Sequence, residues 1–235
     1  MSMTQPRSTL GWRDKQKDDP DVIRLREHLA ANNGIKDLEL LNPTDIARAV
    51  DLFDRDGFVL VQNILNAEQT AILAAGCDEV IDDILALDAE YSGNRGSHRY
   101  SFGGSSLTRS QLHRPAWQML LEVTAVTDLV SAIFRSERYM LRAASGDFCL
   151  PGAVEYQPLH SDVGDWRSDE KSPFSSFYDP RGKVTIRDLP CPYVCVNFMP
   201  QDLTPLNGPT RQIPGTQNSR DTIPGLKDEI GRAHV

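Results

Sequence analysis

The spacing of hydrophobic residues changes a little past the middle of the chain. In the first part, apolar side chains recur every three or four positions, which is the spacing that places them on one face of a helix. This pattern predicts helices at residues 21–32, 45–56, 66–85 and 115–134. Asn66 is a suitable N-cap for the third helix, and Gly57 is expected to end the second. The expected apolar faces consist of Ile46, Ala47, Val50, Leu52 and Phe53 in the second helix and Ile72, Leu73, Val80, Ile81, Ile84 and Leu85 in the third.

From Tyr139 onward, apolar and β-branched residues occur in short runs that Pro, Gly, Asn and Asp separate. Such runs are typical of strands joined by turns. They predict strands at residues 139–143, 153–157, 184–186, 192–198 and 210–213, and a further strand is expected earlier, at 58–61. The stretch 91–110, rich in glycine and serine, predicts a long loop. Helices followed by many short strands predict an α+β fold with a sandwich or jelly roll in its second half.

Size and composition indicate one globular domain. The chain has 235 residues, of which 40% are hydrophobic and 25% are charged, so it can bury a core. We expect a polar leader with a short helix at residues 1–40 and a single domain at 41–229. The net charge of −8 argues against nucleic acid or an anionic membrane as a partner, because both require clustered Lys and Arg. No apolar run approaches membrane-spanning length, so a cytoplasmic location is the expectation.

The four cysteines are expected to be inert core thiols. Cys191 and Cys195 have a local spacing, but no second pair of Cys or His follows them as a structural zinc site would require. Cys77 and Cys149 are isolated in the sequence.

His160 and Asp162 are the strongest candidates for chemistry. Two metal ligands separated by one residue point to the same side of an extended strand. That spacing can supply two members of the 2-His-1-carboxylate set that holds non-haem Fe(II) and leaves coordination positions open. A surface pair that arises by chance is the commoner origin of so short a motif, so the pair alone does not decide the function.

Three segments together resemble the phytanoyl-CoA dioxygenase family of Fe(II)/2-oxoglutarate oxygenases. The first is Leu52–Leu65, which contains Asp56-Gly57-Phe58; the second is Gln157–Asp162; the third is Val196–Gln217. The third segment contains two turn sequences, Asn207-Gly208-Pro209 and Pro214-Gly215-Thr216. Their order and spacing also resemble the family over roughly residues 42–220. The family motif usually ends in His, where this chain has Gln217, a position that does not ligate iron in the family.

The resemblance implies a double-stranded β-helix (a cupin-like jelly roll) with N-terminal helices packed on it. It also implies Fe(II) as cofactor and 2-oxoglutarate and O2 as co-substrates, with hydroxylation or another oxidation of a C–H bond in a small molecule, coupled to decarboxylation of 2-oxoglutarate to succinate. His160 and Asp162 would be the catalytic metal ligands, and the intact Asp162 favours hydroxylation over halogenation. Gln157 would reach 2-oxoglutarate only through a bulge or at the end of the strand, because it lies three positions before His160. Trp166 would wall the cofactor pocket or simply pack.

The third ligand that the family requires is missing from its expected place. After Gln217 the only histidine is His234, which has no strand pattern around it and no basic residue after it to hold 2-oxoglutarate. The other histidines, His28, His98 and His113, are expected on a helix face, in the loop and at a helix boundary. Residues 230–235 can be back-translated into a common sequencing-library adapter. We therefore expect a C-terminally truncated fragment with a non-native tail after Glu229, lacking its last strands and inactive by itself.

Two other functions fit parts of the sequence. A jelly-roll module that binds a small molecule without catalysis would explain the missing third ligand. A metal-dependent isomerase or hydrolase on a cupin-like barrel is less well supported, because such sites usually contain more histidines than this one pair. Substrate identity and oligomeric state do not follow from the sequence.

Overall fold

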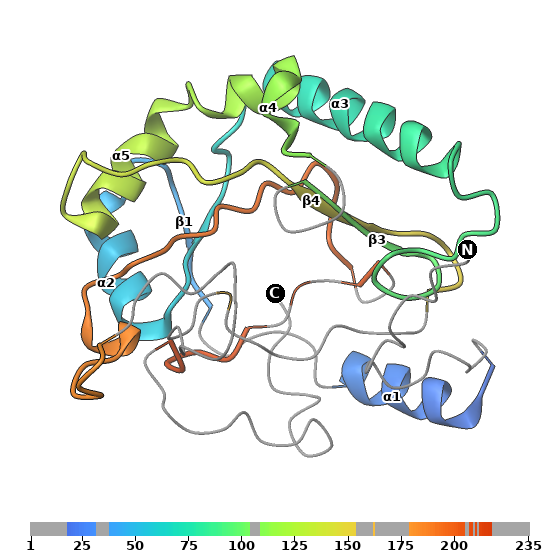
Figure 1. Ribbon diagram of the computed structural model, residues 1–235, viewed down its shortest axis with the longest axis horizontal. Helices are drawn as coiled ribbons and strands as arrows, with labels where there is room; N and C mark the ends of the chain where they lie inside the picture. The colour runs from blue at the N-terminus through green and yellow to red at the C-terminus, as the bar shows by residue number, and fades with distance from the viewer. Residues whose placement is uncertain are drawn as a thin grey trace.

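The computed structural model describes residues 18–31, 38–103, 109–153, 162, 179–204, 207–208, 210 and 212–217. Within these residues the chain is α+β, and Figure 1 shows the helices between residues 46 and 134 arching over two short sheets, with the helix at residues 20–31 apart from that arch. In chain order the elements are α1 (Pro20–Ala31), β1 (Leu40–Leu41), α2 (Ile46–Asp56), β2 (Leu60–Val61), α3 (Ala67–Leu85), β3 (Arg99–Phe102), the 3-10 turn η1 (Gln111–His113), α4 (Pro115–Leu120), α5 (Thr124–Phe134), β4 (Gly146–Cys149) and the 3-10 turn η2 (Ile186–Asp188).

The helix boundaries confirm the expectations from capping residues. Asn66 accepts a hydrogen bond from the Gln69 amide at 2.8 Å, and the Gln69 side chain accepts one from the Asn66 amide at 2.9 Å. This reciprocal capping box satisfies two of the amides that every helix start leaves without intrahelical partners. At the other boundary, Gly57 ends α2 in the left-handed conformation, with φ of 82°, and its amide donates to the carbonyl of Phe53.

The predicted helix at 115–134 is two helices. α4 ends at Leu120 and α5 begins at Thr124, so the chain changes direction between them. Two positions assigned to apolar faces, Ala47 and Ile72, are exposed. Ala49 and Gly76 are buried on those helices instead, since small residues allow neighbouring elements to approach closely.

The prediction of a continuous loop at 91–110 is wrong, because β3 lies inside it. β3 pairs antiparallel with β4, with Arg99 opposite Cys149 and Phe102 opposite Gly146. The strand forms because its aromatic side chains are buried: the Tyr100 ring stacks on Phe148 with centroids 4.6 Å apart. The surrounding glycines and serines concealed this four-residue strand in the sequence pattern.

The remaining strand predictions hold only in part. β2 confirms the expected strand at 58–61, although it is two residues long, and it pairs in parallel with β1, which the pattern did not predict. Residues 139–143 and 192–198 are described and belong to no strand, and 184–186 lead into η2, whose Thr185–Asp188 capping box turns the chain. The predicted strands at 153–157 and 210–213 fall partly outside the described residues.

The core consists of two hydrophobic clusters, one under each half of the helical arch. The first joins α3, α4 and β3, and its buried members are Val80, Phe102, Ala116 and Trp117. The second joins β1 and α2 through Leu41, Ala49 and Leu52, with Leu129 of α5 packed against it. The described helices include none that is both long enough and apolar enough to cross a membrane.

Candidate functional site

The structure describes one of the four predicted site residues. Asp162 lies in a bend and its side chain is exposed. His160, Gln157 and Trp166 lie outside the described residues, as do His234 and the tail at 230–235. The pairing of His160 with Asp162 therefore stays a prediction, and the site is built here from the surroundings of Asp162.

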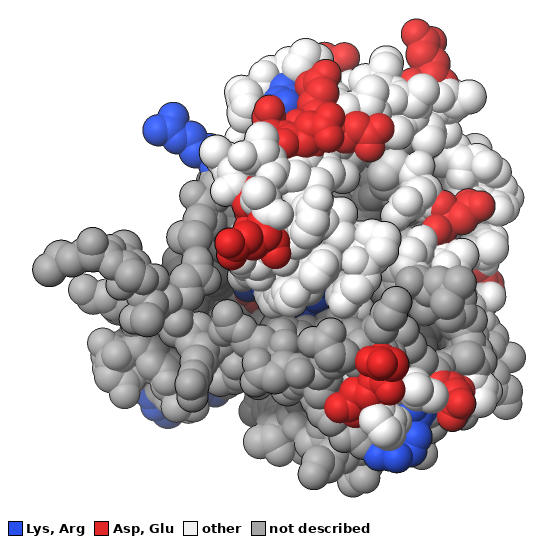
Figure 2. Space-filling model, turned by 90° about the vertical axis from the view of Figure 1, so that its right-hand side faces the viewer, with Lys and Arg blue, Asp and Glu red and all other residues white. Residues whose placement is uncertain are grey.

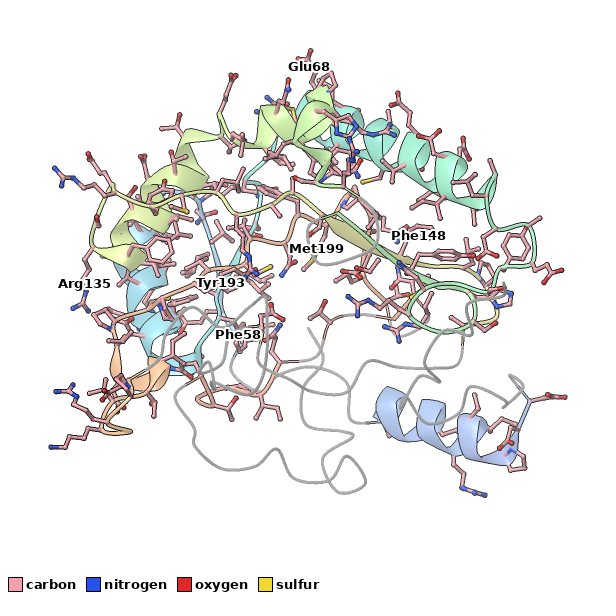
Figure 3. All side chains as sticks on the ribbon, in the orientation of Figure 1. Phe58, Glu68, Arg135, Phe148, Tyr193 and Met199 are labelled. Carbon is pink, nitrogen blue, oxygen red and sulfur yellow. The ribbon has the colours of Figure 1, made fainter. Side chains whose placement is uncertain are left out.

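Asp162 lies beside the extended segment 191–199. Tyr193 is half-buried; loss of hydration raises the pKa of its hydroxyl, and the nearby charges of Cys195 and Asp162 raise it further. The pKa of the Cys195 thiol is raised by the same two kinds of cause, first the loss of hydration and then the negative charge of Asp162. Figure 3 shows Tyr193 nearer α2 and Met199 nearer β4 on this segment. The carboxylate thus lies close to the segment with which the third family-like motif begins.

A second stretch of chain, the one leading from α5 into β4, reaches the same place. Arg142 lies close enough to Tyr193 for its positive charge to oppose the rise in the tyrosine pKa. Asp147, on β4, adds to the rise in the pKa of the Cys195 thiol, and Cys195 Sγ lies 3.6 Å from Asn197 Oδ1. Asp162 therefore lies where segments 142–147 and 193–197 come together, and both signs of charge are present there.

The chemistry of this place fits part of an Fe(II) site. An exposed carboxylate is one of the three ligands that the 2-His-1-carboxylate set requires. In the part of the chain that the structure describes, no three His, Cys, Asp or Glu side chains are grouped closely enough to hold a metal ion. Two described histidines have local partners elsewhere: Nδ1 of His98 lies 2.7 Å from Ser97 Oγ, and Nδ1 of His113 lies 3.1 Å from the Ser110 carbonyl.

The expectation of four core thiols is wrong for two of them. Cys149 and Cys195 are exposed, whereas Cys77 and Cys191 are partly buried, and all four are free. Burial raises the pKa of the Cys77 and Cys191 thiols, which lowers their thiolate population at neutral pH. Cys77 packs against the first hydrophobic cluster, so the predicted inert role applies best to that residue.

The first and third family-like segments meet at the end of α2. The predicted turn at Pro214-Gly215-Thr216 is present, with Gly215 at φ of 77°, whereas Pro209 of the other predicted turn lies outside the described residues. The Gly215 amide donates to the carbonyl of Asp56, and Gln217 Nε2 donates to the carbonyl of Asp54, both at 2.9 Å. The sequence analysis did not predict this contact. A signal for it was present, because both family-like segments occur in the order expected of the family.

Comparison with known proteins gives one match. A model of the Phytanoyl-CoA dioxygenase (PhyH) family matches residues 53–229. No curated protein and no solved structure matches the chain. The family match includes all three segments discussed above from Phe53 onward, and it covers well over half of the 235 residues. The chain belongs to the phytanoyl-CoA dioxygenase family.

Proposed function

We propose that this protein is a non-haem Fe(II)/2-oxoglutarate-dependent dioxygenase that hydroxylates, or otherwise oxidises, a C–H bond of a small molecule. The family generally comprises non-haem iron and 2-oxoglutarate dioxygenases, which supports the reaction class. The observation that carries the proposal within this chain is the place of Asp162, the acidic residue of the family-like iron motif. Its carboxylate lies where segments 142–147 and 193–197 converge. We also propose that the protein is cytoplasmic and that its core is a jelly roll.

In this proposal His160 and Asp162 hold the iron, and Gln157 and Trp166 contribute to the side on which 2-oxoglutarate binds. The iron and its co-substrate would supply the oxidation, with decarboxylation of 2-oxoglutarate to succinate as the coupled half-reaction. The protein's own part is to place the two ligands and to surround them. Near Asp162, Tyr193 provides a half-buried aromatic side chain and Arg142 provides a positive charge.

The proposal is tested by measuring succinate formation from 2-oxoglutarate with Fe(II) and O2. The assay is run on residues 1–235 and on the product of the parent gene, recovered with its flanking sequence. In the parent protein we expect His160→Ala and Asp162→Ala to abolish turnover, since each removes an iron ligand. Glu68→Ala is the matched control, because it removes an exposed carboxylate in the first turn of α3, outside the iron motif and outside the segments near Asp162. It should retain most of the wild-type activity.

Unchanged turnover in Asp162→Ala of the parent protein would refute the iron assignment. A second measurement separates chemistry from binding: an anaerobic complex with Fe(II) and 2-oxoglutarate should show a weak visible charge-transfer band that both ligand variants lack. A parent protein that folds and binds small molecules, yet shows neither the band nor turnover, would instead be the non-catalytic jelly-roll module.

A further inference from the structure

The C-terminal end of α2 is closed by residues far along the chain. The last four carbonyls of a helix have no intrahelical donors and need partners from elsewhere. In α2 these carbonyls belong to Phe53, Asp54, Arg55 and Asp56. Gly57 donates to the first, and residues 215–217 provide donors for the other three. Figure 1 shows the red end of the described chain beside this helix end.

Gln217 is the main side-chain partner in this contact. Its Nε2 donates to the Asp54 carbonyl at 2.9 Å and lies 3.4 Å from the Arg55 carbonyl. Gly57 leaves the space that the glutamine fills, because a Cβ at Gly57 would lie 2.8 Å from Gln217 Oε1 and 2.9 Å from Gln217 Cβ. A one-carbon addition at position 57 would therefore collide with the docked side chain.

The same helix end also lies close to the start of the segment that borders Asp162. The charge of Asp54 acts on the Cys191 thiol, which places Cys191 near the last turn of α2. Tyr193 and Cys195 follow directly and lie near Asp162. The stretch from Cys191 to Gln217 thus begins near the last turn of α2 and is hydrogen-bonded to that same turn through Gly215 and Gln217, and the residues near Asp162 lie within it.

We propose that Gln217 is a positioning residue, whose amide fastens the stretch 191–217 to the end of α2 and thereby keeps Tyr193 and Cys195 beside Asp162. This inference rests on the proposed function in taking Asp162 as an iron ligand. The fastening itself requires no iron, so it is tested separately.

The chemistry of the contact predicts which residues can replace Gln217. The helix end offers only acceptors and carries partial negative charge. Glu has nearly the same shape as Gln, but its carboxylate cannot donate and is repelled there. Lys cannot reproduce the shape, but its ammonium donates and is attracted. If hydrogen-bond donation by the Gln217 amide holds the segment, Lys should hold it as well, and Glu should not.

The test is peptide-resolved labelling of cysteines with a thiol reagent in the metal-free protein. Gln217→Glu should raise the labelling rate of the partly buried Cys191 several-fold over wild type. Gln217→Lys should keep this rate near the wild-type value. Cys77, which belongs to α3 and packs against the first hydrophobic cluster, is the internal control and should not change in either variant.

Three outcomes overturn the proposal. The first is a Gln217→Glu protein whose Cys191 labels at the wild-type rate. The second is a parallel rise at Cys77, which would mean general destabilisation. The third is a Gln217→Lys protein that labels like Gln217→Glu, which would mean that shape rather than hydrogen-bond donation holds the segment. The labelling of wild type, Gln217→Glu and Gln217→Lys can be as expected while the parent protein has no oxygenase activity. In that case the proposed function fails and the positioning role of Gln217 stands.

Discussion

Asp88 and Tyr100 form a polar pair that joins β3 to the turn before it. One Asp88 oxygen accepts hydrogen bonds from the Gly93 amide and the Tyr100 hydroxyl, both at 2.8 Å, and the other accepts from the Ser92 amide at 3.1 Å. Tyr100 itself is buried. The carboxylate thus fixes the turn that precedes β3, and the tyrosine joins that turn to the strand.

Tyr100 should make stability fall in alkaline solution. Burial, followed by the hydrogen bond to Asp88 and its negative charge, raises the pKa of Tyr100 to about 12 from an ordinary value of 10.0. A folded-state pKa above the unfolded one contributes stability that is complete below pH ~10 and is lost as the pH rises through about 12. Urea unfolding of wild type and Tyr100→Phe between pH 8 and roughly 11.5 measures this loss.

We expect wild type to lose stability over this range more steeply than Tyr100→Phe, because phenylalanine cannot ionise. Tyr139→Phe is the matched control, since Tyr139 is 40% exposed. Equal slopes for wild type and Tyr100→Phe would contradict the prediction.

For single residues, the sequence predicts a role that depends on neighbouring positions and misses a role that depends on distant partners. Asn66 and Gly57 were identified as helix boundaries because capping depends on the few residues around them. Gln217 was noted only as a departure from the family motif, since its partner Asp54 is 163 residues away. Tyr100 was placed in a loop because burial, which no local pattern shows, made its strand.

Helices α3 and α4 pack closely through Gly76. An added Cβ at Gly76 would lie 2.5 Å from Ala116 Cβ and 3.4 Å from Trp117 Cζ3. Alanine is normally better than glycine inside a helix by about 1 kcal/mol. Overpacking of a filled core costs roughly 1–3 kcal/mol, so the contact should reverse this preference.

We therefore expect Gly76→Ala to lower the free energy of unfolding, as measured by urea denaturation. The double variant Gly76→Ala, Ala116→Gly should recover part of the loss, because it moves the methyl group from one helix to the other. A more stable Gly76→Ala protein would show that the two helices are not held at this distance.

Some helices and strands are easier to predict from their sequences than others. α2 and α3 carry enough turns for the helical period to emerge, and both were predicted. The strands are two or four residues long, too short for an alternating pattern to stand out. The segment 192–198 has the composition of a strand but is extended without belonging to one, and it is this segment that borders Asp162.

At the scale of the molecule, acidic residues outnumber basic ones, 33 to 25. Figure 2 shows this on one face, where red side chains exceed blue ones among the described atoms. The excess was evident from composition, but the partners of individual carboxylates were not. Hydrogen bonds from arginines lower the pKa of Glu39, Asp56 and Asp179, with Arg48, Arg55 and Arg181 as the respective donors.

Asp88 should contribute to the acid response of the protein. Burial raises its pKa, but hydrogen bonds from Gly93, Tyr100 and Ser92 outweigh this and lower the pKa overall. A lowered folded-state pKa contributes stability that is present above the unfolded value, about 3.9, and is lost as the pH falls through the folded one. Glu39, whose partner Arg48 is also exposed, should contribute little, because surface ion pairs are weak.

Asp88→Asn should thus be less stable than wild type by about 1–3 kcal/mol at pH 7, since an amide offers one oxygen in place of the two that accept the three bonds. The difference should shrink as the pH falls below about 4, because the wild-type carboxyl then becomes protonated as well. Urea unfolding at intervals from pH 7 to roughly pH 2.5 measures it, with Glu39→Gln as the exposed control. A gap between wild type and Asp88→Asn that stayed constant with pH would mean that shape, rather than the charge of Asp88, holds the turn before β3.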